Sequence, residues 1–162
     1  RKLPRRGLAL RENAGAVKPD QKEAAGGQQS VVEVFADTER IALKKDEPAT
    51  FRVRLVIDKN YHVLAADLGP DAIEGLIPLR VGLTGGSGVS VFADYPKGEP
   101  YALAGLESEL LVHAGEVEFD LVLERSGDLS GRPIVTLTYQ ACSDTECLEP
   151  VTVELDVAID AD

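Results

Sequence analysis

Alternating apolar and polar residues recur along the chain after residue 30 and predict short β-strands. In residues 116–124 nearly every second position is Val, Phe or Leu, and the positions between them are mostly Glu or Asp. The same two-residue period marks residues 50–57 and 151–157. Because successive side chains of a strand point to opposite faces, each segment is expected to bury one face and expose the other.

Turn-forming residues separate these segments and set the expected architecture. Residues 85–88, with three glycines, are expected to be a loop, since they lack the Lys and the helix of a phosphate-binding loop. Residues 125–132 are expected to form a second loop, and residues 109–113 and 116–124 a hairpin. About eight or nine short strands with little helix predict an all-β fold, an antiparallel β-sandwich.

Residues 1–29 show neither the two-residue period of a strand nor the period of a helix, and they differ in charge from the rest of the chain. They carry seven Lys or Arg and three Asp or Glu, whereas the remainder carries ten Lys or Arg and twenty-five Asp or Glu. We expect a basic linker or partly ordered arm over residues 1–29 and one β-sandwich domain over residues 30–162. The acidic domain is not expected to bind nucleic acid, because phosphate contacts need a basic face.

The chain contains no apolar run near the length of about 18 residues that a membrane-spanning helix needs. It starts at Arg1 and has no methionine, so we expect a mature fragment or an excised domain. Membrane attachment is therefore expected only through segments outside this sequence, if at all.

The only two cysteines, Cys142 and Cys147, lie between the last two predicted strands, with four residues between them. They permit one disulfide, which persists mainly outside the cytosol. As a structural cross-link it would add about 2 kcal/mol, because closing a ring of about six residues removes little entropy from the unfolded chain. The spacing alone leaves two interpretations open, a structural cross-link and a redox centre.

Acidic residues surround the cysteine pair. Asp144, Glu146 and Glu149 lie beside it in sequence, and no Lys or Arg is close. Negative neighbours disfavour the thiolate, which is the reactive form of cysteine. The pair is thus expected to react slowly with free oxidants. Slow reaction is compatible both with an inert cross-link and with a centre that reacts only in a docked complex.

Other chemistry has weaker support in the sequence. A metal site needs three or four ligands, and the two histidines, His62 and His113, are far from each other and from the cysteines. We expect both histidines to be structural or to face solvent, and we expect no metal and no cofactor. A hydrolase that uses His62 or His113 is a third hypothesis, weakened because no serine lies in a nucleophile-elbow context.

The cysteine loop resembles that of a known family, the N-terminal periplasmic domain of the thiol:disulfide interchange protein DsbD (the disulfide bond corrector family). The residues that carry the resemblance are Tyr139, Gln140, Ala141, Cys142, Cys147 and Pro150. Shorter segments follow the family's order at Tyr61-His62-Val63, Leu76-Ile77-Pro78 and Tyr95-Pro96-Lys97-Gly98. The match covers residues 50–157, with a shorter cysteine spacing than the best-known members and Glu149-Pro150 in place of Pro-Pro.

This resemblance implies an immunoglobulin-like sandwich in the periplasm or another extracytoplasmic space. It implies a pair that cycles between dithiol and disulfide and passes electrons between a thioredoxin-like partner and other thiol proteins. In that family the second cysteine, here Cys147, takes part in the mixed disulfide, and Cys142 would resolve it. The implied site consists of the redox pair Cys142 and Cys147, the cap-loop residues Asp94, Tyr95 and Pro96, and the supporting residues Tyr139 and Gln140.

A non-catalytic interpretation remains as the alternative. The chain would then be an immunoglobulin-like interaction module whose disulfide only stiffens a binding edge. That hypothesis predicts that replacing both cysteines by serine leaves partner binding intact and lowers only the stability.

Overall fold

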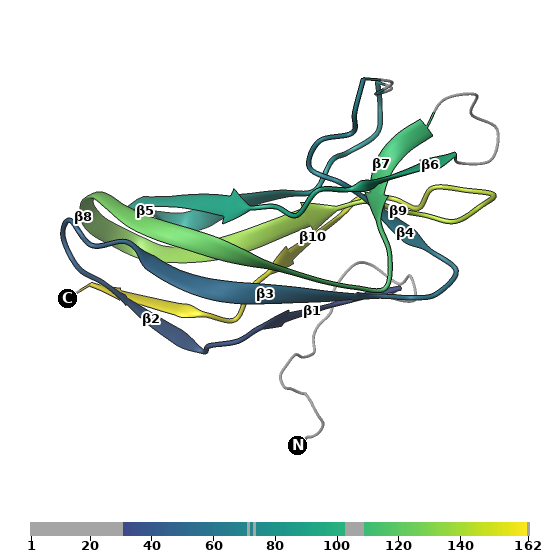
Figure 1. The fold of residues 1–162 in the computed structure, drawn as a ribbon. Coiled ribbons are helices and arrows are strands. Elements are labelled where there is room, and N and C mark those ends of the chain that lie inside the picture. The colour runs from purple at the N-terminus through teal and green to yellow at the C-terminus, as the bar shows by residue number, and fades with distance from the viewer. Residues whose placement is uncertain (1–30, 71, 73, 103–108, 162) are drawn as a thin grey trace, which may run out of the picture.

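The computed structural model describes residues 31–70, 72, 74–102 and 109–161, and these form strands without a helix (Figure 1). The predicted linker, residues 1–29, lies outside the described residues. No helix in the described part has the length and apolar character needed to cross a membrane. The strands are β1 (Val32–Ala36), β2 (Arg40–Leu43), β3 (Ala49–Ile57), β4 (His62–Leu64), β5 (Arg80–Asp94), β6 (Glu99–Ala102), β7 (Glu109–His113), β8 (Glu116–Tyr139), β9 (Ala141–Cys142), β10 (Val151–Glu154) and β11 (Ala158–Ala161).

The sandwich is built around a long antiparallel ribbon, β5 paired with β8. The ribbon bends back on itself at the left of Figure 1, so the two halves of β8 run in opposite directions. The first half of β8 pairs with β3, which pairs with β1, and the second half pairs with β10. The short strands β2 and β11 pair with each other in parallel and contact β3 and β8.

Glycines permit this bend, and they correct two expectations from the sequence. Residues 85–88 and 125–132 were expected to be loops, but they lie within β5 and β8. Gly85 and Gly131 have φ of 80° and 72°, a region that favours glycine. A Cβ on either would stand 2.6 Å from a backbone oxygen of the facing strand. The glycines therefore allow close backbone approach inside a paired ribbon.

The expected hairpin of residues 109–113 and 116–124 is also wrong. β7 pairs with β4 and β6, whereas β8 pairs with β3, β5 and β10, so the chain changes sheets between β7 and β8. The backbone oxygen of Gly115 accepts a hydrogen bond from Ile57 N at 2.8 Å, which fastens the turn to the end of β3. Alternation identified both strands but carried no information about their partners.

Strand lengths differ from expectation as well. β3 and β8 confirm the strands predicted at residues 50–57 and 116–124, but β5 and β8 have 15 and 24 residues and are not short. The predicted last strand, residues 151–157, ends earlier than expected: β10 stops at Glu154, and a further strand, β11, begins at Ala158. The division falls where Leu155 and Val157 both turn into the core, with Val157 N donating to Leu155 O at 2.9 Å.

Two apolar clusters follow from this topology. The larger one lies between the layers of the folded ribbon and joins inward-facing residues of β3, both halves of β8 and the C-terminal segment. The smaller one lies on a four-stranded sheet of order β6-β7-β4-β9, which Figure 1 shows at the end of the sandwich opposite the ribbon's bend. It consists of Leu64, Leu68, Leu110, Val112 and Cys142. The fold is an all-β, immunoglobulin-like sandwich with the cysteine loop between β9 and β10.

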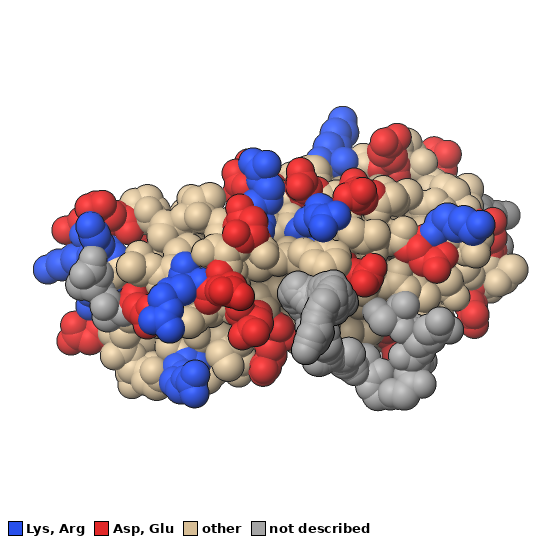
Figure 2. Space-filling model, turned by 90° about the horizontal axis from the view of Figure 1, so that it is seen from below, with Lys and Arg blue, Asp and Glu red and all other residues tan. Residues whose placement is uncertain are grey.

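The charged surface mixes both signs. Figure 2 shows Lys and Arg among Asp and Glu over one face of the molecule. On adjacent strands Arg52 Nε lies 3.1 Å from Asp120 Oδ1, and Arg54 Nη1 lies 2.9 Å from Glu116 Oε1. These exposed cross-strand pairs favour the β3–β8 register, although such ion pairs contribute little to stability.

Candidate thiol–disulfide site

The cysteine loop is a very short hairpin whose turn is closed by a serine. Ser143 N donates to Glu146 O at 2.7 Å, which closes the turn. The Oγ of Ser143 also accepts from the backbone nitrogens of Thr145 and Glu146, each at 3.2 Å. A serine side chain that binds nearby backbone groups favours this turn over a continued strand.

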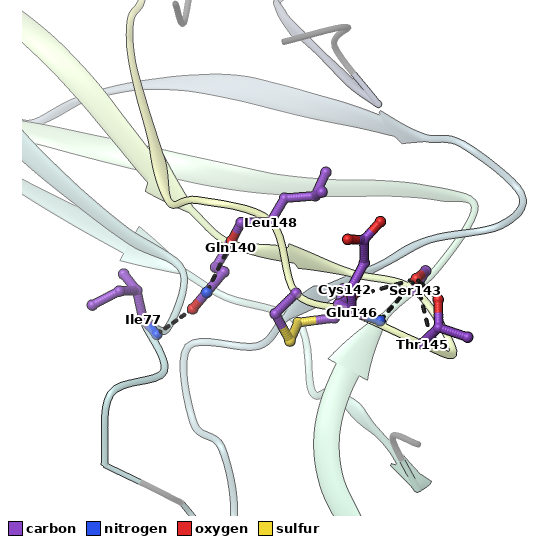
Figure 3. The surroundings of a disulfide bond; sticks show 8 residues. Ile77, Gln140, Cys142, Ser143, Thr145, Glu146 and Leu148 are labelled. Carbon is purple, nitrogen blue, oxygen red and sulfur yellow. Dashed lines mark hydrogen bonds between the residues drawn. A yellow bond between two sulfur atoms is a disulfide. The ribbon is translucent and has the colours of Figure 1, made fainter. Parts of the chain in front are cut away.

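The two cysteines face each other across this hairpin. Leu148 N donates to Ala141 O at 2.9 Å, so one hydrogen-bonded pair lies on each side of Cys142 and Cys147. The cysteines therefore occupy a non-hydrogen-bonded position, where opposite Cα atoms come closest. Their Cα atoms are 4.0 Å apart, and their sulfurs form a disulfide (Figure 3).

The two sulfur-bearing residues differ in exposure. Cys142 belongs to the smaller apolar cluster and is completely buried. Cys147 lies on the returning arm of the hairpin and is exposed. An incoming protein can therefore approach the disulfide from the Cys147 side, whereas the Cys142 side is covered by the domain itself.

Gln140 anchors the loop to the segment before β5. Its side chain is buried, its Oε1 accepts from Ile77 N at 2.8 Å, and its Nε2 donates to Leu148 O at 3.0 Å (Figure 3). The preceding residue, Tyr139, is buried in the larger cluster. Gln140 thus links the loop to the segment before β5, and the supporting role of Tyr139 and Gln140 for the pair stays a prediction.

A histidine and a tyrosine lie on the covered side of the pair. His62 on β4 is the register partner of Cys142 on β9, so both side chains project from the same face of the small sheet. The Tyr101 ring stacks on His62, with centroids 3.9 Å apart and planes at 28°. The Tyr101 hydroxyl donates to a carboxylate oxygen of Asp144, and this hydrogen bond raises the pKa of Tyr101.

Among the residues expected to form the cap loop, Tyr95 contacts strands β5 and β8. Tyr95 packs on Phe119 at 5.6 Å between ring centroids, and its hydroxyl accepts from Val81 N at 3.0 Å. Burial raises the pKa of Tyr95. Asp94, Tyr95 and Pro96 line a polar surface pocket of about 380 Å³. A role for these three residues as a lid over the sulfurs stays a prediction. Tyr101 contacts the cysteine loop through its hydrogen bond to Asp144.

Sequence reasoning did not find Tyr101, and no local signal marks it. The sequence around it, with Pro100 before it and Ala102 after it, shows no strand pattern. In the structure Tyr101 lies on β6, at the edge of the small sheet farthest from β9. Only the strand order brings its ring across the sheet to His62 and the cysteine loop. His62 was expected to be structural or exposed, and its position opposite Cys142 also depends on strand pairing.

The described residues contain no group of three or more His, Cys, Asp or Glu side chains arranged to hold a metal ion. The chemistry that the site can perform with its own groups is that of the two sulfurs. The acidic side chains of the loop, Asp144 and Glu146, are exposed beside them.

Comparisons with known proteins give information at the level of structure. No protein-family model matches the sequence, and no curated protein matches it. Among solved structures, the N-terminal periplasmic domain of ScsB from Proteus mirabilis matches with a TM-score of 0.57 and 18% identity over 82% of this chain. The N-terminal domain of DsbD from Neisseria meningitidis, in its reduced form, gives a TM-score of 0.43 and 19% identity over 67% of this chain and 75% of its own.

The match to the ScsB domain spans 49% of that solved chain, so this chain corresponds to about half of it. At 18% identity the likeness is one of fold. This likeness of fold agrees with the antiparallel strands of the structure. It also agrees with the immunoglobulin-like sandwich that the resemblance of the cysteine loop implied. The described chain has the all-β, immunoglobulin-like fold of the N-terminal periplasmic domain of ScsB.

Proposed function

We propose that the domain is an extracytoplasmic thiol–disulfide interchange module whose working pair is Cys142 and Cys147. The observation that carries the proposal is the unequal exposure of the two joined cysteines, one completely buried and one exposed. A structural cross-link has no need of an outward sulfur. Exchange with another protein needs one sulfur within reach and a second that is protected until the bond opens.

The chemistry assigns a different role to each sulfur. A thiolate of the partner attacks Cys147 Sγ, a new disulfide forms between the proteins, and Cys142 leaves with the electron pair of the broken bond. A second partner thiolate then attacks the intermolecular disulfide and releases Cys147, so the pair gains two electrons and the partner is oxidised. In the opposite direction Cys142 attacks the intermolecular disulfide and resolves it.

The partner that fits this site is a thioredoxin-like protein or domain. The exposed acidic groups beside Cys147 make the pair a poor target for free anionic thiols, which favours reaction inside a docked complex. The extracytoplasmic location is supported by the likeness of the fold to a periplasmic domain and by the closed disulfide, a bond that persists mainly outside the cytosol.

A trapping experiment tests the roles directly. In Cys142→Ser, Cys147 is loaded as its thionitrobenzoate mixed disulfide and mixed with a thioredoxin-like protein that lacks its second active-site cysteine. We expect release of thionitrobenzoate and a covalent complex on a non-reducing gel, because the exposed sulfur accepts the attack.

The matched control is Cys147→Ser, which leaves only the buried sulfur. We expect slow loading of Cys142 and no complex under the same conditions. A complex at Cys142 that forms as readily as at Cys147, or no complex from either variant, contradicts the assigned roles.

The alternative function is a non-catalytic interaction module, in which the disulfide only stiffens the short hairpin at a binding edge. It predicts that the protein with both cysteines replaced by serine binds its partner as before. Loss of covalent exchange together with unchanged binding affinity and unchanged reductive activity of the partner would favour this function over interchange.

A further inference from the structure

Two buried nitrogens have no hydrogen-bond partner in the described part of the chain, Nδ1 of His62 and Nε2 of His113, and the first lies on the face that carries Cys142. Buried polar atoms are normally paired, so an unpaired one calls for an explanation. The cross-strand neighbour of His62 is Cys142, whose sulfur is in a disulfide and carries no hydrogen. Reduction would place a hydrogen on that sulfur, and the residue paired with Cys142 across the strands carries an imidazole nitrogen able to accept one.

The burial of Cys142 creates a need for such a group. When the disulfide opens, Cys142 leaves as a thiolate in a completely buried position within an apolar cluster. A thiolate without water or a nearby positive group is strongly disfavoured there. A protonated imidazole beside the sulfur can supply the missing hydrogen and remove this barrier.

Neighbouring contacts hold the His62 ring in place. The Tyr101 ring stacks on it, and the Tyr101 hydroxyl is bound to Asp144 in the cysteine loop. Among the described residues, Tyr101 from β6 stacks on His62 and Cys142 from β9 pairs with it, and Asp144 from the loop contacts Tyr101. His113 on β7 pairs with Val63, so its side chain projects from the opposite face of the sheet.

We propose that His62 is the proton donor and acceptor for Cys142 during thiol–disulfide exchange, a role that rests on the proposed function. When a thiolate attacks Cys147, the bond between the sulfurs breaks and Cys142 takes its electron pair. Protonated His62 then gives its proton to the Cys142 thiolate and becomes neutral. In the reverse direction neutral His62 takes the proton from the Cys142 thiol, which then attacks the mixed disulfide at Cys147.

The test measures the rate at which dithiothreitol reduces the disulfide as a function of pH, divided by the dithiothreitol thiolate concentration. In the unchanged protein this normalised rate should fall as pH rises, because the protonated form of a histidine is lost with rising pH. In His62→Phe, which keeps an aromatic ring against Tyr101, the rate at the acidic end of the series should be at least about tenfold lower and the profile flat.

The matched control is His113→Phe, the other histidine of the same sheet, which should keep the pH-dependent profile. Because a buried substitution can unfold a domain, His62→Gln is measured as well, and thermal unfolding is recorded for every variant. A direct readout on the unchanged protein is the NMR titration of its two histidines. Reduction should shift the imidazole nitrogen signals of His62 and leave those of His113 in place.

The outcomes separate this inference from the proposed function. The role of His62 alone is overturned if His62→Phe keeps the normalised pH profile of the unchanged protein. It is also overturned if the imidazole nitrogen signals of His62 do not change on reduction. A disulfide in the unchanged protein that forms no mixed disulfide with a thioredoxin-like protein overturns the proposed function first.

Discussion

The two apolar clusters of this domain differ in composition and in what they surround. The larger cluster joins the layers of the folded β5–β8 ribbon, and its buried members are aliphatic or aromatic. The smaller cluster covers one face of the four-stranded sheet and includes a cysteine sulfur, with a histidine ring and a tyrosine ring against it. The larger cluster therefore provides stability, and the smaller one carries the groups that can react.

The difference shows how one domain can keep a reactive bond near a stable core. The smaller sheet contributes to both clusters: Val63 and Ala141 belong to the larger cluster, whereas Leu64 and Cys142 of the same strands belong to the smaller one. Gln140 is the fixed point between the regions, since it follows Tyr139 of the larger cluster and binds the base of the loop.

Two matched substitutions, one in each cluster, test whether the clusters differ in their effects on stability and on disulfide reduction. Leu121 and Leu110 are both completely buried, the first in the larger cluster and the second in the smaller. Leu121→Ala should lower the free energy of unfolding by about 2–5 kcal/mol, because it leaves a cavity in a packed core. It should change the rate of disulfide reduction less than twofold, as measured with dithiothreitol.

Leu110→Ala should have a different signature in the same two assays. A cavity beside Cys142 should let solvent and reductant reach the buried sulfur and so accelerate reduction of the disulfide. The variant should also have a lower free energy of unfolding, because the cavity removes packing contacts. If both variants change reduction equally, the separation of the two clusters is wrong.

The second prediction concerns the link between the regions. Gln140→Leu keeps an apolar side chain of similar size but leaves Ile77 N–H and Leu148 C=O without their side-chain partners. We expect a loss of about 1–3 kcal/mol in the free energy of unfolding, measured by urea denaturation. Hydrogen exchange should also increase at Leu148 and in the hairpin. Unchanged exchange there would show that Gln140 does not hold the loop.

The smallest expected effect is a dependence of stability on pH. Burial lowers the pKa of His113 below its ordinary value. Its folded-state pKa lies below the unfolded one, so this contribution to stability is present above about pH 6.5 and is lost as pH falls through the folded pKa. Urea denaturation at pH 7 and about pH 5 should show a larger loss for the unchanged protein than for His113→Leu. Equal losses would contradict the assignment.

Local patterns in the sequence predicted the strands better than their pairing. Alternation identified β3 and the first half of β8 because each buries one face. Glycines at residues 85–88 and 125–132 predict loops because glycine is common in turns. In the structure they allow two strands to bend together, a use that depends on the facing strand and has no local signature.

The candidate site was predictable to the extent that it is local in sequence. Cys142, Cys147 and Gln140 lie within eight residues and were found from the loop itself. Tyr101 and His62 reach the loop only through the order β6-β7-β4-β9, which no spacing reveals. The lid role of Tyr95 came from a resemblance in order along the chain and stays a prediction. Its ring packs on Phe119.

The central claim is that Cys142 and Cys147 form a working redox pair, and the reduction potential of the disulfide tests it most directly. The potential is obtained from the fraction of disulfide at equilibrium in a series of glutathione or dithiothreitol redox buffers. We predict a value above about −300 mV, within reach of thioredoxin-like partners. A value well below about −300 mV, typical of structural disulfides, would contradict the account.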